Sequence, residues 1–432
     1  MNENIIDYKY EMVYVTTLKG YKKAINDNYV LIYTPKEFDK EVFAYLESNK
    51  DDNKRLLFQY GYALLLGKGV EKDEEKAIEI ISKIAKKGDL EAMTIYGLYE
   101  ISESNKGIGL KFVKKAARKG YAIAEKALGN IYVEGELVDK DYRKAFKLFK
   151  SAADKGLAKA QNSVGNMYKV GVGTRRDMKK SVEYYRLAAE QGNVSAQYNL
   201  ANMFFGGYGV KQNYELAAFY YSLAAEANDK DALFNMGYMY EQGFGIKKSY
   251  RKAFALYKKA SERGNLVASY NLGVLYFKGR GTKKNNEEGF KMHLFAAKKG
   301  LIKAQCSVVR LYIKGIGTDV NVKEALKWSE IVLRSEDVEA KTFMNFFLGY
   351  LYERGIGVDK DLKKAEKHYK YAAGYGEVEA QINLAKLLEK EKRIDEAELW
   401  YTLAIRDKSE RTIKLLKTFL KKHERIRGEQ NE

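Results

Sequence analysis

Residues 193–228 read NVSAQYNLANMFFGGYGVKQNYELAAFYYSLAAEAN, and this stretch is one complete copy of a pattern that recurs along most of the chain. Ala196, Leu200 and Phe204 are spaced four residues apart, as on the apolar face of an amphipathic helix. Glycines at 206, 207 and 209 end that helix, because glycine tolerates the positive φ of a helix C-cap. A second apolar run follows Asn213. The stretch therefore predicts two helices joined by a glycine turn.

One position of the first helix recurs in the same local context along the chain, and we call it the register position. Its spacing is almost always 36 residues, with single intervals of 32 and 40. Self-similarity at such a period is the signature of a stacked repeat array, in which each repeat buries its apolar face against its neighbours. The register position is occupied by Gly61, Gly97, Gly129, Gly165, Ala201, Gly237, Gly273, Val309, Gly349 and Ala385.

The start of the second helix is marked by residue types that cap helices. Their side chains accept a hydrogen bond from the exposed amides of the first turn, for about 1 kcal/mol each. The predicted caps are Asp73, Asp141, Asp177, Asn213, Ser249, Asn285, Asn321 and Asp361. Five first helices have predicted caps of their own, at Asp89, Asn193, Asp229, Asn265 and Asp337.

The fixed pattern of small and aromatic residues predicts how the two helices pack. Small residues at the register position, and Ala-Ala pairs such as Ala188-Ala189, allow two helix axes to approach closely. Tyr185, Tyr221 and Tyr257 recur in register on the second helix, and a repeated aromatic of this kind is typical of a core. We therefore interpret these rings as packing residues.

The string AQYNLA at 196–201, the glycine turn and the Ala-x-x-x-Tyr pattern resemble the Sel-one-like repeat (SLR) family, a relative of the tetratricopeptide repeat. The resemblance covers about residues 53–408, or ten repeats. It implies an all-α fold, a right-handed superhelical α-solenoid of antiparallel helix pairs with first helices on the concave side. It also implies a role as adaptor or scaffold. Four repeats depart from the pattern. Residues 103–105 and 388–392 replace the glycine turn in two of them, a third keeps only Gly135 of its glycine pair, and the repeat around 325–348 has four extra residues.

The array has distinct ends. Residues 1–51 form an N-terminal segment whose Thr34-Pro35 start predicts a capping helix over 36–49, with Pro35 first in the helix. Tyr8, Tyr10 and Met12 alternate as in a strand. The array spans 52–408, and 409–432 contain a basic amphipathic helix and tail. That helix is expected to cap the array through Ile413, Leu416, Phe419 and Leu420; a calmodulin-target or membrane-surface helix has a similar pattern.

No residue pattern indicates catalysis. His293, His368 and His423 lack zinc-ligand spacing, and Cys306 is the only cysteine. The Gly-x-Gly pairs lack the Gly-Lys-Ser/Thr of a phosphate-binding loop. We therefore expect no enzyme activity, cofactor, metal or small-molecule substrate. The first thirty residues lack a secretory-signal pattern, and no apolar run is long enough to span a membrane. We expect a cytoplasmic protein, with unconventional export left open.

The net charge of +19 suggests a nucleic-acid partner, but the lysines are spread over the repeats. Many of them, such as Lys258 and Lys298, fall in the last turn of second helices, where cations complement the helix dipole. We therefore interpret most of the charge as a solvated surface. Nucleic-acid binding remains the weaker alternative.

A partner is expected on concave positions of first helices, which by analogy with tetratricopeptide grooves lie three residues before, one after and four after the register position. These positions vary in chemistry in repeats five to seven, and aromatic residues there suit binding hot spots. The predicted site comprises Tyr198, Asn202, Phe205, Phe234, Tyr238, Glu241, Tyr270, Val274, Phe277 and Arg310. The function predicted is a protein- or peptide-binding scaffold; an exported effector or a toxin-neutralising immunity-type protein is the alternative.

Overall fold

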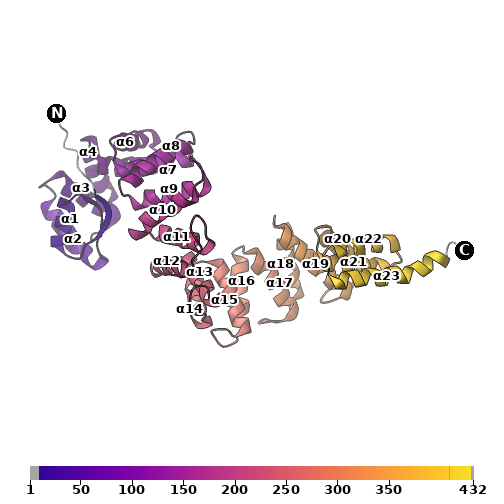
Figure 1. Cartoon of the computed structure of the whole chain (residues 1–432). Helices are drawn as coiled ribbons and strands as arrows, with labels where there is room; N and C mark the ends of the chain where they lie inside the picture. The colour runs from indigo at the N-terminus through magenta and orange to yellow at the C-terminus, as the bar shows by residue number, and fades with distance from the viewer. Residues whose placement is uncertain (1–8, 408, 430–432) are drawn as a thin grey trace. The chain divides into compact units, whose positions relative to one another are not determined.

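The computed structural model describes residues 9–407 and 409–429 (Figure 1). These residues divide into two compact units. The N-terminal unit comprises the chain up to Ala232 together with Gly243–Lys247, and the C-terminal unit comprises Leu233–Gln242 and the chain from Lys248 onward. Among the described helices, none combines the length and apolar character needed to cross a bilayer.

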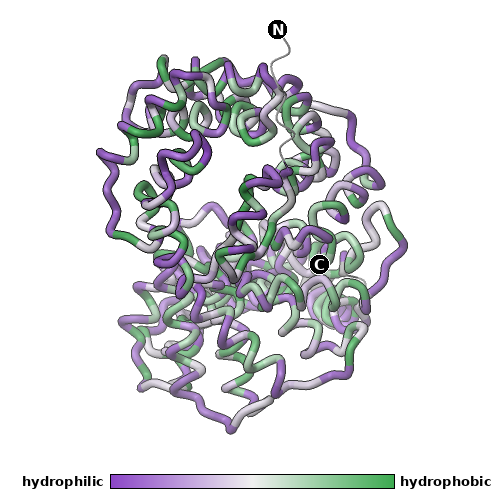
Figure 2. Tube along the Cα trace, turned by 90° about the vertical axis from the view of Figure 1, so that its left-hand side faces the viewer, coloured by the Kyte–Doolittle hydropathy of each residue, from purple (hydrophilic) through white to green (hydrophobic). Residues whose placement is uncertain are grey.

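Ten consecutive helix pairs form the array within the described residues, as the period predicts. The first helices are α3 (Lys54–Leu66), α5 (Leu90–Ser102), α7 (Ala122–Glu134), α9 (Ala158–Val170), α11 (Val194–Gly206), α13 (Lys230–Gln242), α15 (Leu266–Lys278), α17 (Ile302–Lys314), α19 (Val338–Arg354) and α21 (Val378–Lys390). The second helices are α4 (Glu74–Lys86), α6 (Lys106–Arg118), α8 (Tyr142–Asp154), α10 (Met178–Glu190), α12 (Tyr214–Glu226), α14 (Tyr250–Glu262), α16 (Asn286–Lys298), α18 (Val322–Arg334), α20 (Leu362–Gly374) and α22 (Ile394–Ala404). Hydrophobic and hydrophilic residues alternate along these helices (Figure 2).

The predicted caps are confirmed. Each of the eight second-helix caps accepts a hydrogen bond from the backbone N–H three residues later, as Asp177 does from Lys180. All five predicted first-helix caps behave in the same way. These local contacts set the helix starts at the repeat period.

In five of the ten repeats, a ring of the second helix lies against a glycine at the register position. A Cβ atom at Gly165 would lie 2.6 Å from the ring of Tyr185, and one at Gly237 would lie 2.7 Å from the ring of Tyr257. The same contact joins Gly129 to Phe149, Gly273 to His293 and Gly349 to Tyr369. The aromatic rings predicted as core are therefore packing residues, and Tyr185, Tyr257 and Tyr369 are fully buried.

The glycine turns serve two purposes, as α15 illustrates. Gly279 caps the helix at φ 63°, and Gly281 follows at φ 75°, both left-handed values that side chains disfavour. A Cβ atom at Gly281 would also lie 2.1 Å from the backbone oxygen of Tyr250, at the start of the preceding second helix. The turn glycine therefore lets adjacent repeats touch backbone to backbone.

A buried glutamine forms a further hydrogen bond between repeats, which the sequence pattern did not lead us to predict. Gln161 of α9 donates to the backbone oxygen of Ala153 in α8, and Gln381 of α21 donates to Ala373 in α20. Gln197 and Gln305 make the equivalent bond. Each adds a second hydrogen bond to a carbonyl in the last turn of the preceding second helix, which also accepts from the backbone N–H of the closing glycine, as Ala153 does from Gly156. The Ala-Gln pair that recurs in these repeats is the sequence signal from which this hydrogen bond could have been predicted.

The N-terminal segment is more structured than its sequence indicates. Strands β1 (Lys9–Tyr14) and β2 (Tyr29–Tyr33) pair in parallel, and helix α1 (Leu18–Asn26) connects them. β1 covers Tyr10 and Met12, where alternation predicts a strand, and Tyr8 lies outside the described residues. The expected helix over 36–49 begins later: a short 3-10 turn, η1 (Lys36–Phe38), precedes α2 (Asp39–Asn49). Pro35 stands before that turn in an extended conformation (ψ 147°), so its prediction as the first helical residue is wrong.

At the other end, η2 (Ile405–Asp407) leads into helix α23 (Glu410–Glu429). Phe419 is buried, and Leu415, Leu416 and Leu420 pack against the core formed by α20, α21 and α22. Ile413 is 39% exposed, so its assignment to the apolar face is wrong. The face is rotated toward Leu415, because Phe419 packs on the ring of Tyr401 and sets the phase of the helix.

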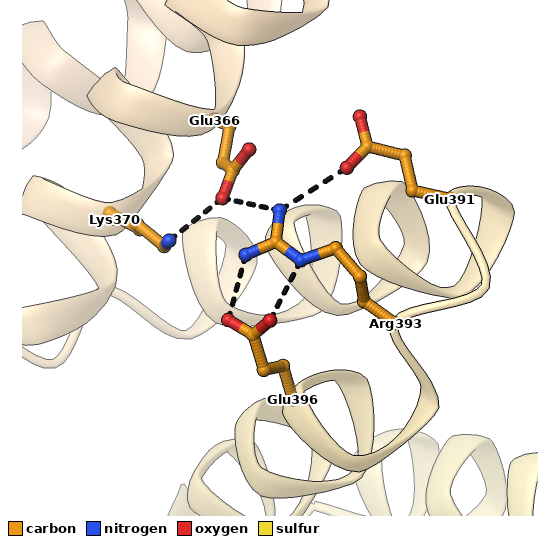
Figure 3. Close-up of polar contacts among 5 residues, drawn as sticks. All are labelled: Glu366, Lys370, Glu391, Arg393 and Glu396. Carbon is orange, nitrogen blue, oxygen red and sulfur yellow. Dashed lines mark hydrogen bonds and ion pairs between the residues drawn. The ribbon is translucent and has the colours of Figure 1, made fainter.

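In the last repeat an ion cluster lies beside the turn that lacks the glycine pair. Lys392 adopts φ 61°, and Arg393 follows it. The Arg393 guanidinium donates to Glu396 through two nitrogens at 2.7 Å, to Glu366 of α20 at 2.8 Å and to Glu391 at 3.2 Å (Figure 3). Lys370 also contacts Glu366, at 2.7 Å. The cluster links α20, the turn and α22.

Candidate functional site

The first-helix face of the N-terminal unit is partly covered by the chain itself. Val30, Leu31 and Ile32 of β2 face a cavity of about 250 Å³ whose array residues come from first helices α3, α5, α7 and α9, together with Lys68 in the turn after α3 and Tyr121 just before α7. The hydroxyl of Tyr10 accepts a hydrogen bond from the backbone N–H of Ala122, at the start of α7. The N-terminal strands therefore occupy part of the face on which a partner was expected.

An arginine ties this cover to the first repeat. Arg55 of α3 donates to the backbone oxygens of Ile25 and Tyr29 and to the side chain of Asn28, each at 2.7 Å. Its Nε lies 3.9 Å from a carboxylate oxygen of Glu91. Burial raises the pKa of Glu91 to about 8, although Arg55 opposes the shift. The cover is thus held by polar as well as apolar contacts.

Three predicted site residues lie on α11 in the N-terminal unit. Tyr198 packs on the ring of Tyr221, with centroids 5.8 Å apart, and Asn202 accepts a hydrogen bond from the Tyr221 hydroxyl at 2.6 Å. Phe205 packs edge-on against Tyr214 and Phe244. All three side chains are half-buried, so much of their surface is used in packing.

Helix α13 of the C-terminal unit contributes Phe234, Tyr238 and Glu241. Phe234 stacks on Tyr257, and Glu241 accepts a hydrogen bond from the Tyr257 hydroxyl at 2.8 Å. Burial, followed by the charge of Glu241, raises the pKa of Tyr257. Tyr238, in contrast, is 36% exposed.

The structure brings the remaining four predicted residues together. Tyr270, Val274 and Phe277 of α15 and Arg310 of α17 line one hollow of about 410 Å³, which we call the basic hollow. Its lining also includes residues that the sequence did not single out: Lys278, Lys284, Asn286, His293, Ser307, Leu311 and Ile316. Residues three before, one after and four after the register position of α15 thus line one hollow together with Arg310 of α17.

A second hollow of about 500 Å³ adjoins the first and shares Tyr270, Ser307 and Arg310 with it. Its other charged residues are Lys303, Asp337 and Glu339, so both signs are present here. The Arg310 guanidinium carbon lies 6.0 Å from the centre of the Phe343 ring. Together the hollows follow the first-helix face from α15 to α19.

His293 lines the basic hollow beside Tyr270 and Ser307, the residues that both hollows share with Arg310. Its ring is buried, with Nδ1 2.7 Å from the Ser307 hydroxyl and Nε2 3.0 Å from the backbone oxygen of Tyr270. Burial lowers the pKa of His293 to about 4; the Tyr270 carbonyl opposes the shift, and Arg310 lowers it further. The ring is therefore neutral at physiological pH and positions Tyr270 and Ser307.

Cys306, which lines the second hollow, is not activated. Burial raises the pKa of its thiol to about 11, whereas a reactive cysteine has a lowered one. Among the described residues, no cluster of histidine, cysteine, aspartate and glutamate is arranged to hold a metal ion. The chemistry available at this surface is therefore hydrogen bonding, charge pairing and apolar contact.

The sequence matches a known repeat model. The model described as Sel1 repeat matches residues 56–89, 122–157, 158–193, 194–229, 230–265, 266–301, 304–331 and 343–374, more than half of the chain. The pairs α5–α6 and α21–α22 lie outside these matches. They are the two repeats in which the glycine turn is replaced.

Solved structures show the same fold. A protective antigen of uropathogenic Escherichia coli strains, displaying an SLR fold, is 27% identical with a TM-score of 0.73, over 93% of this chain and 86% of that one. A Sel1 repeat protein from Oxalobacter formigenes is 28% identical with a TM-score of 0.51, over 57% of this chain and 96% of that one. A search of curated proteins gave no match.

Proposed function

Because this chain belongs to the Sel1 repeat family, we propose that it is a non-catalytic scaffold or adaptor that binds a partner protein or peptide on the first-helix face of its C-terminal unit. Repeat arrays present extended surfaces of this kind. The array contains no cofactor-binding pattern, and its regularities are accounted for by caps, turns and core contacts.

The observation that carries this proposal is the pair of adjoining hollows along α15, α17 and α19. The residues at the register position are buried, whereas Tyr238 and Arg310 are exposed and Val274 and Phe277 are half-buried. Tyrosine and arginine are the residue types that most often dominate binding energy at interfaces. In the N-terminal unit, the chain's own strands cover part of the equivalent face.

A catalytic role for the pair formed by Ser307 and His293 has little support. The geometry joins a hydroxyl to an imidazole at 2.7 Å, but a histidine with a pKa near 4 is a weak general base at neutral pH. Ser307 is also buried. The pair is better interpreted as a packing contact, because His293 stands where other repeats have the buried tyrosine.

The test is a pull-down from extract of the cells that naturally make the protein. Tyr238→Ser and Val274→Ser, combined in one variant, should abolish capture of the specific partner. Ile331→Ser is the matched control, because Ile331 is 46% exposed on the second helix α18. If both variants retain the partner while circular dichroism shows them folded, the binding surface lies elsewhere.

An exported effector or an immunity-type protein is the second candidate. One solved structure that this chain resembles is a protective antigen, whereas cytoplasmic residence is the location we propose for this chain. Fractionation of the native cells distinguishes them: a scaffold remains with the cytoplasm, and an exported effector appears in the medium or on the cell surface.

A further inference from the structure

The charges on the first helices of repeats seven and eight have a single sign. Helices α15 and α17 carry Lys278, Lys303, Arg310 and Lys314, and neither helix contains an aspartate or glutamate. The second helices α16 and α18 carry both signs and form ion pairs such as Lys291–Glu288 and Lys327–Glu324. The positive potential is therefore concentrated on one face of these repeats.

The basic hollow lies on that face. Lys278, Lys284 and Arg310 line it, and its lining includes no aspartate or glutamate. Within residues 9–407 and 409–429, none of these three cations forms an ion pair with a carboxylate. Like charges in a concave surface raise the local positive potential, which favours an anionic partner.

The rest of the lining is apolar. Val274 and Phe277 of α15, and Leu311 and Ile316 at the end of α17, contribute side chains to the same hollow. Phe277 packs edge-on against His293, with centroids 5.2 Å apart, so its position is fixed. A ligand that fits this lining has an apolar side chain beside acidic groups.

The aromatic rings are arranged for a peptide rather than for stacked bases. Tyr270 stacks on His293 with ring centroids 4.4 Å apart, and the Lys303 ammonium lies 5.0 Å from the centre of its ring, so a base would compete with both groups for this ring. Binding of single-stranded nucleic acid depends on bases stacking on open aromatic faces. Two of the three cations are lysines, which lack the planar fork of arginine for phosphate.

We infer that the basic hollow binds an acidic linear segment of a partner protein, with carboxylates on Lys278, Lys284 and Arg310 and one apolar side chain on Val274, Phe277 and Ile316. This inference rests on the proposed function and specifies the chemistry of its partner. The adjoining hollow adds Asp337 and Glu339, so a basic residue beyond the acidic run would extend the complementarity.

The experiment is selection of a random dodecapeptide display library on the full chain. The expected peptides are enriched in aspartate and glutamate around one apolar residue. Their synthetic versions should bind about tenfold or more weakly to a Lys284→Glu/Arg310→Glu variant. The matched control is Lys258→Glu/Lys298→Glu, which reverses two exposed lysines on second helices and should bind normally.

A second comparison uses the unaltered protein, so the result does not depend on a variant folding. Replacing each acidic residue of a selected peptide by its amide should weaken binding by about tenfold or more and remove most of the salt dependence. Selected peptides without acidic enrichment, or with binding unchanged by these replacements, would overturn the inference. So would a labelled single-stranded RNA that binds the hollow in preference to the peptides. The pull-down with neutral substitutions tests the proposed function separately.

Discussion

A Cβ atom at Gly349 would lie 2.6 Å from Cδ1 of the Tyr369 ring, so α19 and α20 approach more closely than a Cβ atom allows without a shift. Gly349→Ala should therefore lower the free energy of unfolding by about 1–3 kcal/mol, because overpacking outweighs the gain in helix propensity. Hydrogen exchange in α19 and α20 measures the effect.

Gly374→Ala is the matched control for this substitution. Gly374 ends α20, and a Cβ atom there meets nothing within 4 Å. Unchanged or slightly slower exchange is expected. Equal destabilisation by both substitutions would contradict the packing explanation for the register position.

The features predictable from sequence are those that depend on neighbouring residues. Asp177 caps its own helix, and Gly279 turns the chain at its own position, so a residue type and its spacing suffice. The contact between Tyr10 and Ala122 could not be predicted, because 112 residues separate them and no periodic pattern joins them.

The candidate site was predictable in part for the same reason. Tyr270, Val274 and Arg310 could be selected by their offsets from the register position, since first helices repeat. Lys284 lies in a turn, and His293 belongs to the second helix, so neither follows from an offset on a first helix. Their place in the basic hollow depends on how two repeats stack.

Arg393 should stabilise the last repeat more than an ordinary surface arginine does. Arg393→Ala removes contacts with Glu366, Glu391 and Glu396, and hydrogen exchange in α22 should become about tenfold faster. Arg334→Ala is the control, because it breaks a single exposed pair with Glu330. An equal effect in both variants would show that the cluster adds nothing.

The same cluster predicts a loss of stability in acid. Burial favours a higher pKa for Glu366, but its hydrogen bonds to Lys370 and Arg393 lower it overall, and the bond to Arg393 lowers the pKa of Glu396. Stabilisation is therefore present above the ordinary carboxyl pKa, about 4.3, and is lost as pH falls through the lower folded values. Exchange in α22 measured against pH should show this loss in the parent and a smaller one in Arg393→Ala, where Lys370 alone still lowers the pKa of Glu366.

His293 should make repeats seven and eight sensitive to mild acid. The unfolded histidine titrates near 6.5 and the folded one near 4, so between these values only the unfolded chain binds the proton. Stability is full above pH 6.5 and falls as pH decreases toward 4. His293→Phe keeps a ring against Gly273 and should remove this dependence from the exchange of α15–α17. A variant with the parent's pH profile would assign the sensitivity to another group.

Tyr10→Phe should loosen the N-terminal cover. The substitution leaves the Ala122 N–H without its acceptor, at a helix start that has no side-chain cap, for a cost of about 1 kcal/mol. Limited proteolysis within residues 9–33 should become faster. Tyr14→Phe is the control, since Tyr14 is 71% exposed, and its cleavage rate should match the parent.

The most direct test of the first-helix face is site-specific photo-cross-linking in the native cells. A benzophenone amino acid at Val274, on α15, should cross-link to a defined partner, whereas the same group at Ile331, on α18, should not. Adding Tyr238→Ser should lower the yield of the Val274 adduct relative to the protein without that substitution. Identical adducts from both positions, or none from Val274 in cells where the protein is folded, would contradict the assignment of this face as the binding surface.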